Sequence, residues 1–392
     1  MQRVLYLLTA TLLFFHSYSQ EVIIPGAERL DQYIHLLKGK NVGLFANQTS
    51  MVGNTHLADT LLKSGVKIKV IFGPEHGFRG NASAGEKVGN YIDEETGIPV
   101  VSLYGTRHKP SPDDLKGVDI LLFDIQDVGV RFYTYISSMQ EFMEAAFENQ
   151  IPLIILDRPN PNGFYVDGPV LQKQFKSFVG MQPVPIVYGM TIGEYAMMIA
   201  GEQWLSKDAN IAYANFKNKN QSKKKFVLMV IRNKNYDHTS KYILPVRPSP
   251  NLPNIQSIYL YPSTCLFEGT TLSEGRGTDK PFQVFGAPSL PKNLYSFTPE
   301  PRPGATSSKH YHQVCYGWNL SGTPEEVLKE VDHKIQLKWI INAWNLFPEK
   351  DSFFIIPKSG NMAQSFFDKL AGNDVLWKQI RDGIPEKEIR ES

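Results

Sequence analysis

The chain has 392 residues, with 41 basic and 39 acidic side chains and a formal charge of +2 at neutral pH. This near balance argues against a surface built to bind nucleic acid or an anionic membrane. A hydrophobic fraction of 42% with 20% charged residues is typical of a globular protein, and the length suggests two domains of ordinary size.

Residues 1–19 have the layout of a signal peptide. Arg3 gives the positive start, residues 4–15 are apolar but too short to span a bilayer comfortably, and Ser17 and Ser19 have the usual cleavage spacing. We therefore expect a mature chain that begins near Gln20, is secreted into the periplasm, and carries no membrane span after cleavage.

Apolar strands alternate with amphipathic helices through the first part of the chain. Strands are expected at 42–47, 68–72, 98–103, 118–125, 151–156 and 226–231, and helices at 28–38, 56–64, 135–149 and 191–205. Thr191 and Glu194 fit a capping box at the start of the last helix. The alternation predicts an α/β domain with a Rossmann-like parallel sheet over residues 20–255.

The motifs of nucleotide-binding proteins are missing from this pattern. No expected strand is followed by G-x-G-x-x-G, and no G-x-x-x-x-G-K-[ST] is present. A Rossmann-like sheet alone does not imply a nucleotide. We therefore expect no cofactor.

The remainder predicts a second, smaller α+β domain over residues 256–392. Before it, the prolines of residues 247–253 block helix and strand, which suits a domain junction or the wall of a groove. Further expectations are a polar insertion at 217–225, a helix or extended segment from 257 to 264, a helix at 324–346 and a strand at 352–356.

An acid and an imidazole follow the expected strand at 68–72. Pro74 and the neighbouring glycines hold Glu75 and His76 on a restricted loop. In open α/β sheets, ligands bind at the carboxyl ends of the strands. An ordinary loop, with His76 capping a neighbour and Glu75 facing water, explains the pair equally well.

Two more polar clusters follow neighbouring strands. Because parallel strands end at one edge, these carboxylates, arginines and amides can converge on a polyol substrate. Helix capping by the first two, or a local ion pair of the fourth and fifth, is an equally good account of them. The residues are Asp124, Asp127, Arg131, Asp157, Arg158 and Asn160.

The polar, glycine-rich loop 268–279 is placed to close over this edge from the second domain. It carries Glu268, Glu274, Arg276 and Asp279. Ligand sites often lie at such junctions. Alternatively, Arg276 and Asp279 pair with each other across their loop.

Other chemistries have weaker support. No H-E-x-x-H or G-x-S-x-G motif is present, and His310 and His312 lack obvious further ligands, so we expect no catalytic metal. Cys265 and Cys315 are explained equally well as a disulfide and as two buried thiols.

Several long motifs make the chain resemble the bacterial exo-β-N-acetylmuramidase family of peptidoglycan glycosidases, long catalogued as a domain of unknown function. They occur in order over nearly all of the mature chain: GPEHGFRG (73–80), AGEKVG (84–89), LLFDIQDVGVRFYTY (121–135), LDRPNPNG (156–163), DGP (167–169), VYGMTIGEYA (187–196), RPSPNLPN (247–254) and FEGTTLSEGRGTDKPFQVFGAP (267–288). The resemblance implies a Rossmann-like domain, a smaller C-terminal domain and an active cleft between them. It implies release of terminal N-acetylmuramic acid from the non-reducing end of cell-wall fragments.

Within this resemblance, Glu75 is the expected catalytic carboxyl group, since burial beside Phe72 and Phe78 would raise its pKa. His76 would orient it or contact the sugar. Asp124, Asp127, Glu268 and Glu274 are candidates for the second carboxyl group that glycosidases use. An arginine should bind the lactyl carboxylate of muramic acid, from a set of four: Arg79, Arg131, Arg158 and Arg276.

The expected partners are peptidoglycan-derived sugars or muropeptides. A rival interpretation is a cell-wall sugar-binding protein that uses the same cleft without catalysis. A metal-dependent hydrolase is a third.

Overall fold

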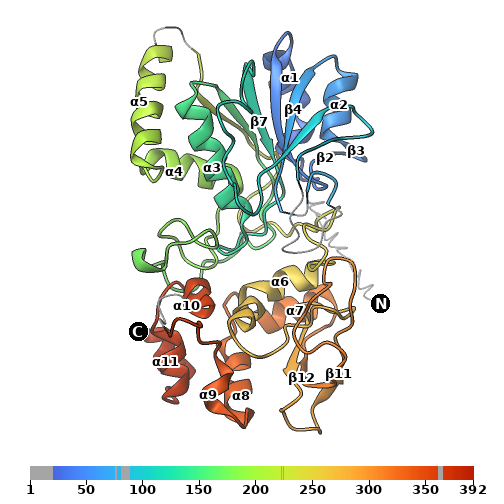
Figure 1. Cartoon of the computed structure of the whole chain (residues 1–392), viewed down its shortest axis with the longest axis vertical. Coiled ribbons are helices and arrows are strands. Elements are labelled where there is room, and N and C mark those ends of the chain that lie inside the picture. Colours follow the sequence, from blue (N-terminus) through green and yellow to red (C-terminus); the bar gives the residue numbers. More distant parts are fainter. Residues whose placement is uncertain (1–20, 76, 81–88, 222, 224, 361–364) are drawn as a thin grey trace, which may run out of the picture.

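A seven-stranded sheet forms one half of the molecule (Figure 1). The computed structural model describes residues 21–75, 77–80, 89–221, 223, 225–360 and 365–392, so His76 and the expected signal peptide lie outside it. The strand order is β5-β6-β4-β1-β7-β8-β9, and every pair except β5–β6 is parallel. The strands are β1 (Asn41–Ala46), β4 (Lys67–Gly73), β5 (Tyr91–Ile92), β6 (Pro99–Ser102), β7 (Ile120–Asp124), β8 (Leu153–Leu156) and β9 (Leu228–Ile231).

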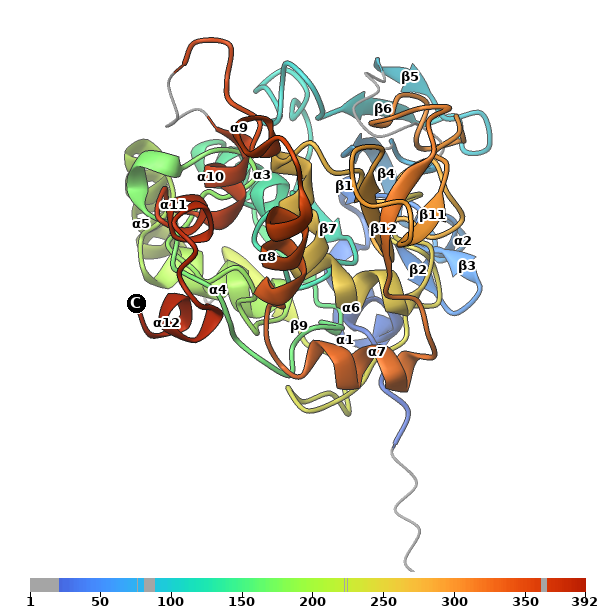
Figure 2. The ribbon, with the colours of Figure 1, turned by 90° about the horizontal axis from the view of Figure 1, so that it is seen from below.

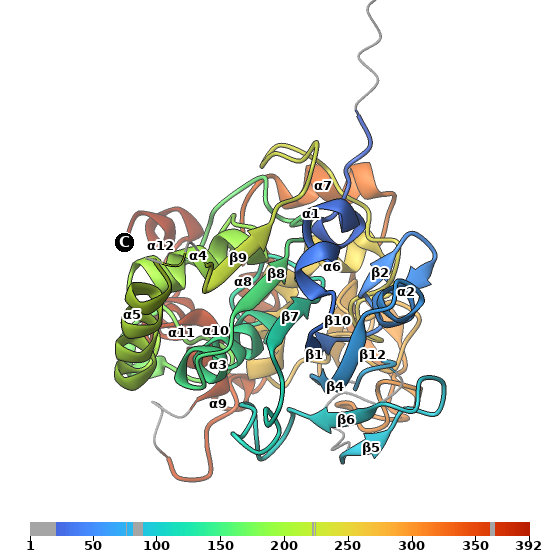
Figure 3. The same cartoon turned by 90° about the horizontal axis from the view of Figure 1, so that it is seen from above.

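Helices cover both faces of this sheet, as the continuous apolar strands predict (Figure 3). Leu44 and Leu122 point to the face covered by α1 (Leu30–Leu37) and α2 (Leu57–Lys63). Phe45 and Phe123 point to the other face, which is covered by three helices: α3 (Tyr135–Glu148), α4 (Ile192–Gly201) and α5 (Lys207–Gln221). The capping box of Thr191 and Glu194 at the start of α4 is confirmed. A small ribbon of β2 (Met51–Val52) and β3 (Thr55–His56) precedes α2.

The chain changes direction across the sheet after β6. From β1 it builds outward through β4 to β6, and then returns to the other side of β1 to form β7, β8 and β9. The carboxyl ends of the strands face the smaller half of the molecule (Figure 1). This edge is where α/β folds bind ligands.

The smaller half combines helices with an antiparallel sheet, which confirms the predicted two-part α/β architecture (Figure 2). It begins with α6 (Ile255–Thr264), capped by Asn254, and the 3-10 helix η3 (Cys265–Gly269). Its sheet has the order β10-β12-β11. The remaining elements are β10 (Val284–Ala287), β11 (Tyr295–Phe297), β12 (Cys315–Asn319), α7 (Pro324–Val331), α8 (Leu337–Leu346), α9 (Lys350–Phe353), α10 (Phe366–Ala371), α11 (Leu376–Arg381) and α12 (Glu386–Glu391).

Three local predictions were wrong. The helix expected at 324–346 breaks after Val331, because Asp332 adopts a left-handed conformation with φ of 48°. The strand expected at 352–356 is replaced by α9 and a loop, in which Phe353 and Phe354 both pack on Trp344 at ring distances of 5.3 and 5.7 Å. An extended strand would send these neighbours to opposite faces.

The polar insertion expected at 217–225 instead begins as the end of α5, which runs to Gln221. Tyr213 of this helix lies 4.5 Å from Phe147 of α3, ring to ring, so one face is anchored while the polar residues face solvent. Residues 257–264 are helical. Cys265 and Cys315 are both free and buried.

No helix in the described ranges is long and apolar enough to cross a membrane.

Asp368 of α10 predicts a pH-dependent stability. Its side chain is buried, and neither carboxylate oxygen has a hydrogen-bond partner within the described part of the chain. Burial raises its pKa from 3.8 to about 7. The folded state therefore holds a proton that the unfolded chain releases, so this contribution to stability is present below pH 4 and is lost as the pH rises through 7. We expect Asp368→Asn to raise the melting temperature at pH 8 and leave it nearly unchanged at pH 4, measured by thermal unfolding. An equal shift at both pH values would contradict this account.

Candidate active site

A cavity of about 540 Å³ lies between the carboxyl edge of the large sheet and the smaller half. Both halves supply its walls, so the cavity exists only when the two are packed together. From the sheet half come Glu75, Tyr104, Gly105, His108, Phe132, Tyr133, Thr134, Tyr135, Phe178 and Val179; from the junction and the smaller half come Ser249, Asn251, Leu252, Tyr261, Cys265, Glu268, Arg276, Phe282, Phe366 and Leu370.

Glu75 enters the cavity from the loop after β4. The N–H of Gly77 donates to the carbonyl of Pro74 at 2.9 Å, and Gly77 takes a φ of 74° that favours glycine, so the turn containing Glu75 is tight. Gly73 pairs with Ser102 of β6, which brings Glu75 beside Tyr104. The Tyr104 hydroxyl is hydrogen-bonded to Glu75, and burial and this carboxylate together raise the pKa of Tyr104.

His108 lies on the same wall as Glu75 and Tyr104. Its ring stacks on Phe178 with a centroid distance of 3.9 Å, and burial lowers its pKa. A neutral imidazole is therefore present near the Glu75 carboxylate at neutral pH. It is a residue that sequence reasoning missed.

Two tyrosines fix the junction loop over the cavity. The Tyr133 hydroxyl donates to the carbonyl of Pro248 at 3.0 Å, and the Tyr135 hydroxyl reaches the same carbonyl at 3.3 Å. Asn47, at the end of β1, donates from Nδ2 to the Tyr135 hydroxyl at 2.9 Å. The proline-rich loop is thereby tied to the ligand-binding edge of the sheet.

Acidic and basic side chains from the loop after η3 form a charged cluster in the opposite wall. Arg276 Nη2 lies 2.7 Å from Glu268 Oε1, and Arg276 Nε lies 3.6 Å from Glu274 Oε1. Lys309 Nζ lies 3.2 Å from Glu274 Oε2. Glu268 and Arg276 line the cavity, whereas Glu274 is buried behind them.

The two glutamates of this cluster differ in their ionisation. Burial, assisted by the charge of Glu274, raises the pKa of Glu268 despite the attraction of Arg276. Burial also disfavours the charged form of Glu274, but Lys309 and Arg276 together lower its pKa. Glu274 is thus the permanent counterion, and Glu268 is the group able to exchange a proton.

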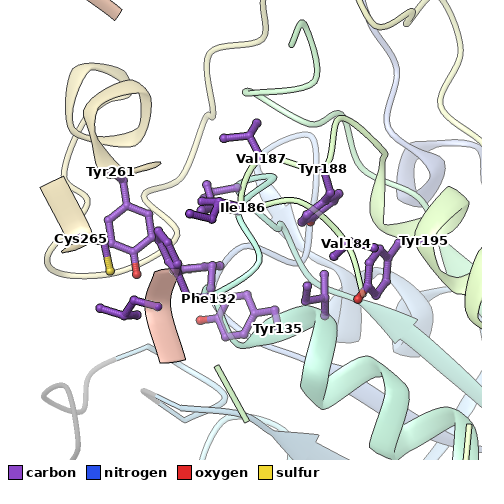
Figure 4. Packing of buried hydrophobic residues seen from close by; sticks show 14 of the residues in the cluster. Phe132, Tyr135, Val184, Ile186, Val187, Tyr188, Tyr195, Tyr261 and Cys265 are labelled. Atoms are coloured by element: carbon purple, nitrogen blue, oxygen red, sulfur yellow. The ribbon is translucent and has the colours of Figure 1, made fainter. Parts of the chain in front are cut away.

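Aromatic rings and a thiol complete the wall (Figure 4). Tyr261 lies 5.4 Å from Phe132 and 4.8 Å from Phe282 between ring centroids. Cys265 lies beside Tyr261 in Figure 4, and its Sγ is 3.7 Å from Glu268 Oε1. The cavity therefore offers apolar ring faces next to carboxylates and a guanidinium, a combination suited to a charged sugar.

Other expected site residues lie outside this lining. Arg158 makes a two-pronged ion pair with Asp124, with N–O distances of 2.6 and 2.8 Å, and both side chains are buried. Asp127 accepts hydrogen bonds from the Tyr188 hydroxyl and, at 2.6 Å, from the N–H of Gly129; burial raises its pKa to about 6.

Asp157 and Asn160 serve the start of α4 and its approach. Asp157 accepts from the N–H of Gly193 at 2.8 Å and the Thr191 hydroxyl at 3.0 Å, and burial raises its pKa to about 6. Asn160 donates to the carbonyl of Met190 at 2.8 Å.

Arg131 joins the two halves of the molecule. Its buried guanidinium donates to the backbone carbonyls of Pro169 and Val184, and to those of Leu370 and Ala371 at the end of α10. The N–O distances range from 2.7 to 3.0 Å. Arg131 therefore holds in place the helix whose residues Phe366 and Leu370 line the cavity.

Arg79 and Asp279 are paired elsewhere. Arg79 grips Asp93 at 2.8 and 3.0 Å and also contacts Glu95 at 3.1 Å. Asp279 pairs with Arg302 at the surface. Of the four candidate arginines, Arg276 is the one that lines the cavity.

The lining residues that sequence reasoning passed over include Tyr104, His108, Phe178, Asn251 and Tyr261. A usable signal existed for Tyr104, which follows a predicted strand of the same sheet as Glu75 does. Tyr261 had none, because its segment was left open between helix and extended chain. No group of three or more His, Cys, Asp or Glu side chains suited to a metal ion occurs among the described residues.

Comparisons with known proteins agree over both halves. Residues 42–256 match the family model described as exo-beta-N-acetylmuramidase NamZ, N-terminal, and residues 259–392 match its C-terminal counterpart. The chain is 42% identical over 383 residues to the peptidoglycan beta-N-acetylmuramidase NamZ of Bacillus subtilis (strain 168), covering 92% of this chain and 84% of that protein.

Solved structures give the same result. A DUF1343 family protein from Bacteroides fragilis NCTC 9343 superposes with a TM-score of 0.81 at 44% identity, and a second from the same strain with 0.73 at 29%; each match covers 94% of both chains. The chain therefore belongs to the exo-β-N-acetylmuramidase family.

Proposed function

We propose that this chain is a glycoside hydrolase that releases terminal β-linked N-acetylmuramic acid from the non-reducing end of peptidoglycan fragments. The observation that carries the proposal is the cavity between the two halves, which brings Glu75, Glu268 and Arg276 together in one space. Two carboxyl groups and a guanidinium are the groups that hydrolysis of an acidic sugar requires. The relative from Bacillus subtilis, whose name states this activity, supports the same conclusion.

Glu75 and Glu268 are the proposed catalytic carboxyl groups. Glu75 stands at the ligand-binding edge of the sheet, hydrogen-bonded to Tyr104. Glu268 faces it from the other half, with a pKa that burial raises, and a proton donor needs such a raised pKa. His76 remains a predicted partner of Glu75.

Arg276 is the proposed contact for the lactyl carboxylate of muramic acid. Its guanidinium is fixed by Glu268 and Glu274 and lies 5.2 Å from the ring centre of Phe282. Arginine suits this role because its planar fork matches a carboxylate. When Glu268 holds a proton, Arg276 and Lys309 face the single negative charge of Glu274, and the cluster attracts an anion.

We also propose that the mature protein is secreted and works in the periplasm. The signal-peptide layout of residues 1–19 supports this location, and so does a substrate made of cell-wall sugars.

The test uses three chromogenic β-glycosides: an N-acetylmuramide, its lactyl methyl ester and an N-acetylglucosaminide. We expect rapid release of the chromophore from the muramide and little from the other two, because only the muramide carries the free carboxylate. Addition of a chelator is expected to leave the rate unchanged. Binding of the muramide without release would overturn the glycosidase proposal and favour a sugar-binding protein. Equal rates with muramide and ester would overturn the role of Arg276.

A further inference from the structure

A second hollow of about 600 Å³ adjoins the cavity, and nothing in the proposed reaction has so far used it. We call it the proline groove, after Pro250, Pro253, Pro281 and Pro303 in its walls. Asn251 lines both the cavity and the groove.

The same three chain segments build both hollows. The loop after β4 gives Glu75 to the cavity and Gly80 to the groove. The loop after η3 gives Arg276 to the cavity and Gly277 to the groove, and the junction loop contributes to each. A chain-like ligand held in the cavity can therefore continue into the groove past Asn251.

The groove is held in one shape by main-chain contacts. Asn251 Nδ2 donates to the carbonyl of Gly304 at 2.8 Å. Gly304 has a φ of 86°, and a Cβ at this position would lie 2.3 Å from Pro250 Cβ. The N–H of Glu300 donates to the carbonyl of Gly277 at 2.8 Å. Few rotatable parts line the groove, so binding costs little ordering.

Two arginines give the groove its charge. Arg247 is exposed, and Arg302 pairs with Asp279, whose side chain is 84% exposed. Ion pairs this exposed contribute little stability, so a ligand carboxylate can displace Asp279 from Arg302. The groove thus suits a polar chain that carries a negative charge.

We propose that the proline groove binds the leaving part of the glycan, and that Arg302 and Arg247 bind the carboxylate of its second muramic acid residue. This inference rests on the proposed function. Peptidoglycan alternates N-acetylmuramic acid with N-acetylglucosamine. With the terminal muramic acid in the cavity, the glucosamine lies near Asn251 and the second muramic acid, with its carboxylate, reaches the groove.

The experiment compares a peptide-free tetrasaccharide of two muramic acid–glucosamine repeats with the single-repeat disaccharide and the chromogenic muramide. We expect the wild type to have the highest kcat/KM for the tetrasaccharide. Arg302→Gln and Arg247→Gln are each expected to lower the tetrasaccharide-to-chromogenic ratio of kcat/KM roughly threefold to tenfold, chiefly through KM. Asp279→Asn should raise that ratio, because it frees Arg302.

This opposite sign separates recognition of a carboxylate from a structural role of the ion pair, whose loss from either side would act in the same direction. Arg381→Gln, on α11 outside both hollows, is the matched control and should leave the ratio unchanged. Methyl-esterification of the second lactyl group should reproduce the effect of the arginine replacements.

Equal kcat/KM for tetrasaccharide and disaccharide, or a fall with Asp279→Asn, would overturn the inference while leaving the glycosidase intact. No turnover of the chromogenic muramide would instead overturn the proposed function itself.

Discussion

Glu75→Gln is expected to lower kcat on the chromogenic muramide roughly 10²–10⁴-fold, the usual contribution of a positioned general acid or base. The amide is nearly the same size as the carboxyl group but cannot transfer a proton. Because Glu75 lies at the cavity wall on a tight turn, the change should leave the fold and the binding of muramic acid largely intact. Steady-state kinetics and binding of the free sugar by calorimetry measure the two effects separately.

The matched control is Glu330→Gln, an exposed glutamate of α7 that pairs with Lys338. It removes the same charge far from the cavity and should keep full activity. Near-normal turnover by Glu75→Gln would reject its catalytic assignment. Loss of binding together with turnover would make Glu75 a sugar contact.

The second large effect concerns the stability of the sheet half. Arg158→Met is expected to lower the free energy of unfolding by about 3–5 kcal/mol, because it leaves the buried Asp124 carboxylate without its guanidinium. Urea unfolding followed by circular dichroism measures the loss. As the pair lies outside the cavity lining, the KM of the folded enzyme is not expected to change.

Replacing both partners gives the control for this effect. The double variant Asp124→Leu with Arg158→Met has no unpaired buried charge, so it should be more stable than Arg158→Met alone. A double variant less stable than the single one would show that the ion pair itself, and not the stranded charge, carries the energy.

Local pattern was sufficient to predict the parallel sheet and most of its helices. Strands buried on both faces are continuous apolar runs, and the box of Thr191 and Glu194 marks the start of α4. The break at Asp332 was not predictable in this way, since a left-handed φ leaves no trace in hydrophobic spacing. The smaller half depends more on such turns and on clustered aromatic rings such as Phe353 and Phe354, so its elements were predicted less well.

The candidate site shows a similar division. The strand-end rule led to Glu75, and it holds equally for Tyr104. It names an edge, however, and not the direction of each side chain. Asp124 and Arg158 follow neighbouring strands at that edge, yet they turn toward each other because β7 and β8 are adjacent. Adjacency of strands comes from the fold as a whole, and no short stretch of sequence contains it.

The way in which Arg131 holds α10 has a consequence for redesign of the enzyme. Its guanidinium grips the carbonyls of Leu370 and Ala371, which every amino acid possesses, and ignores their side chains. Phe366 and Leu370 can therefore be exchanged for other helix-forming residues while the helix stays anchored. A library of variants at these two positions should reshape the cavity for sugars with different substituents without loosening the joint.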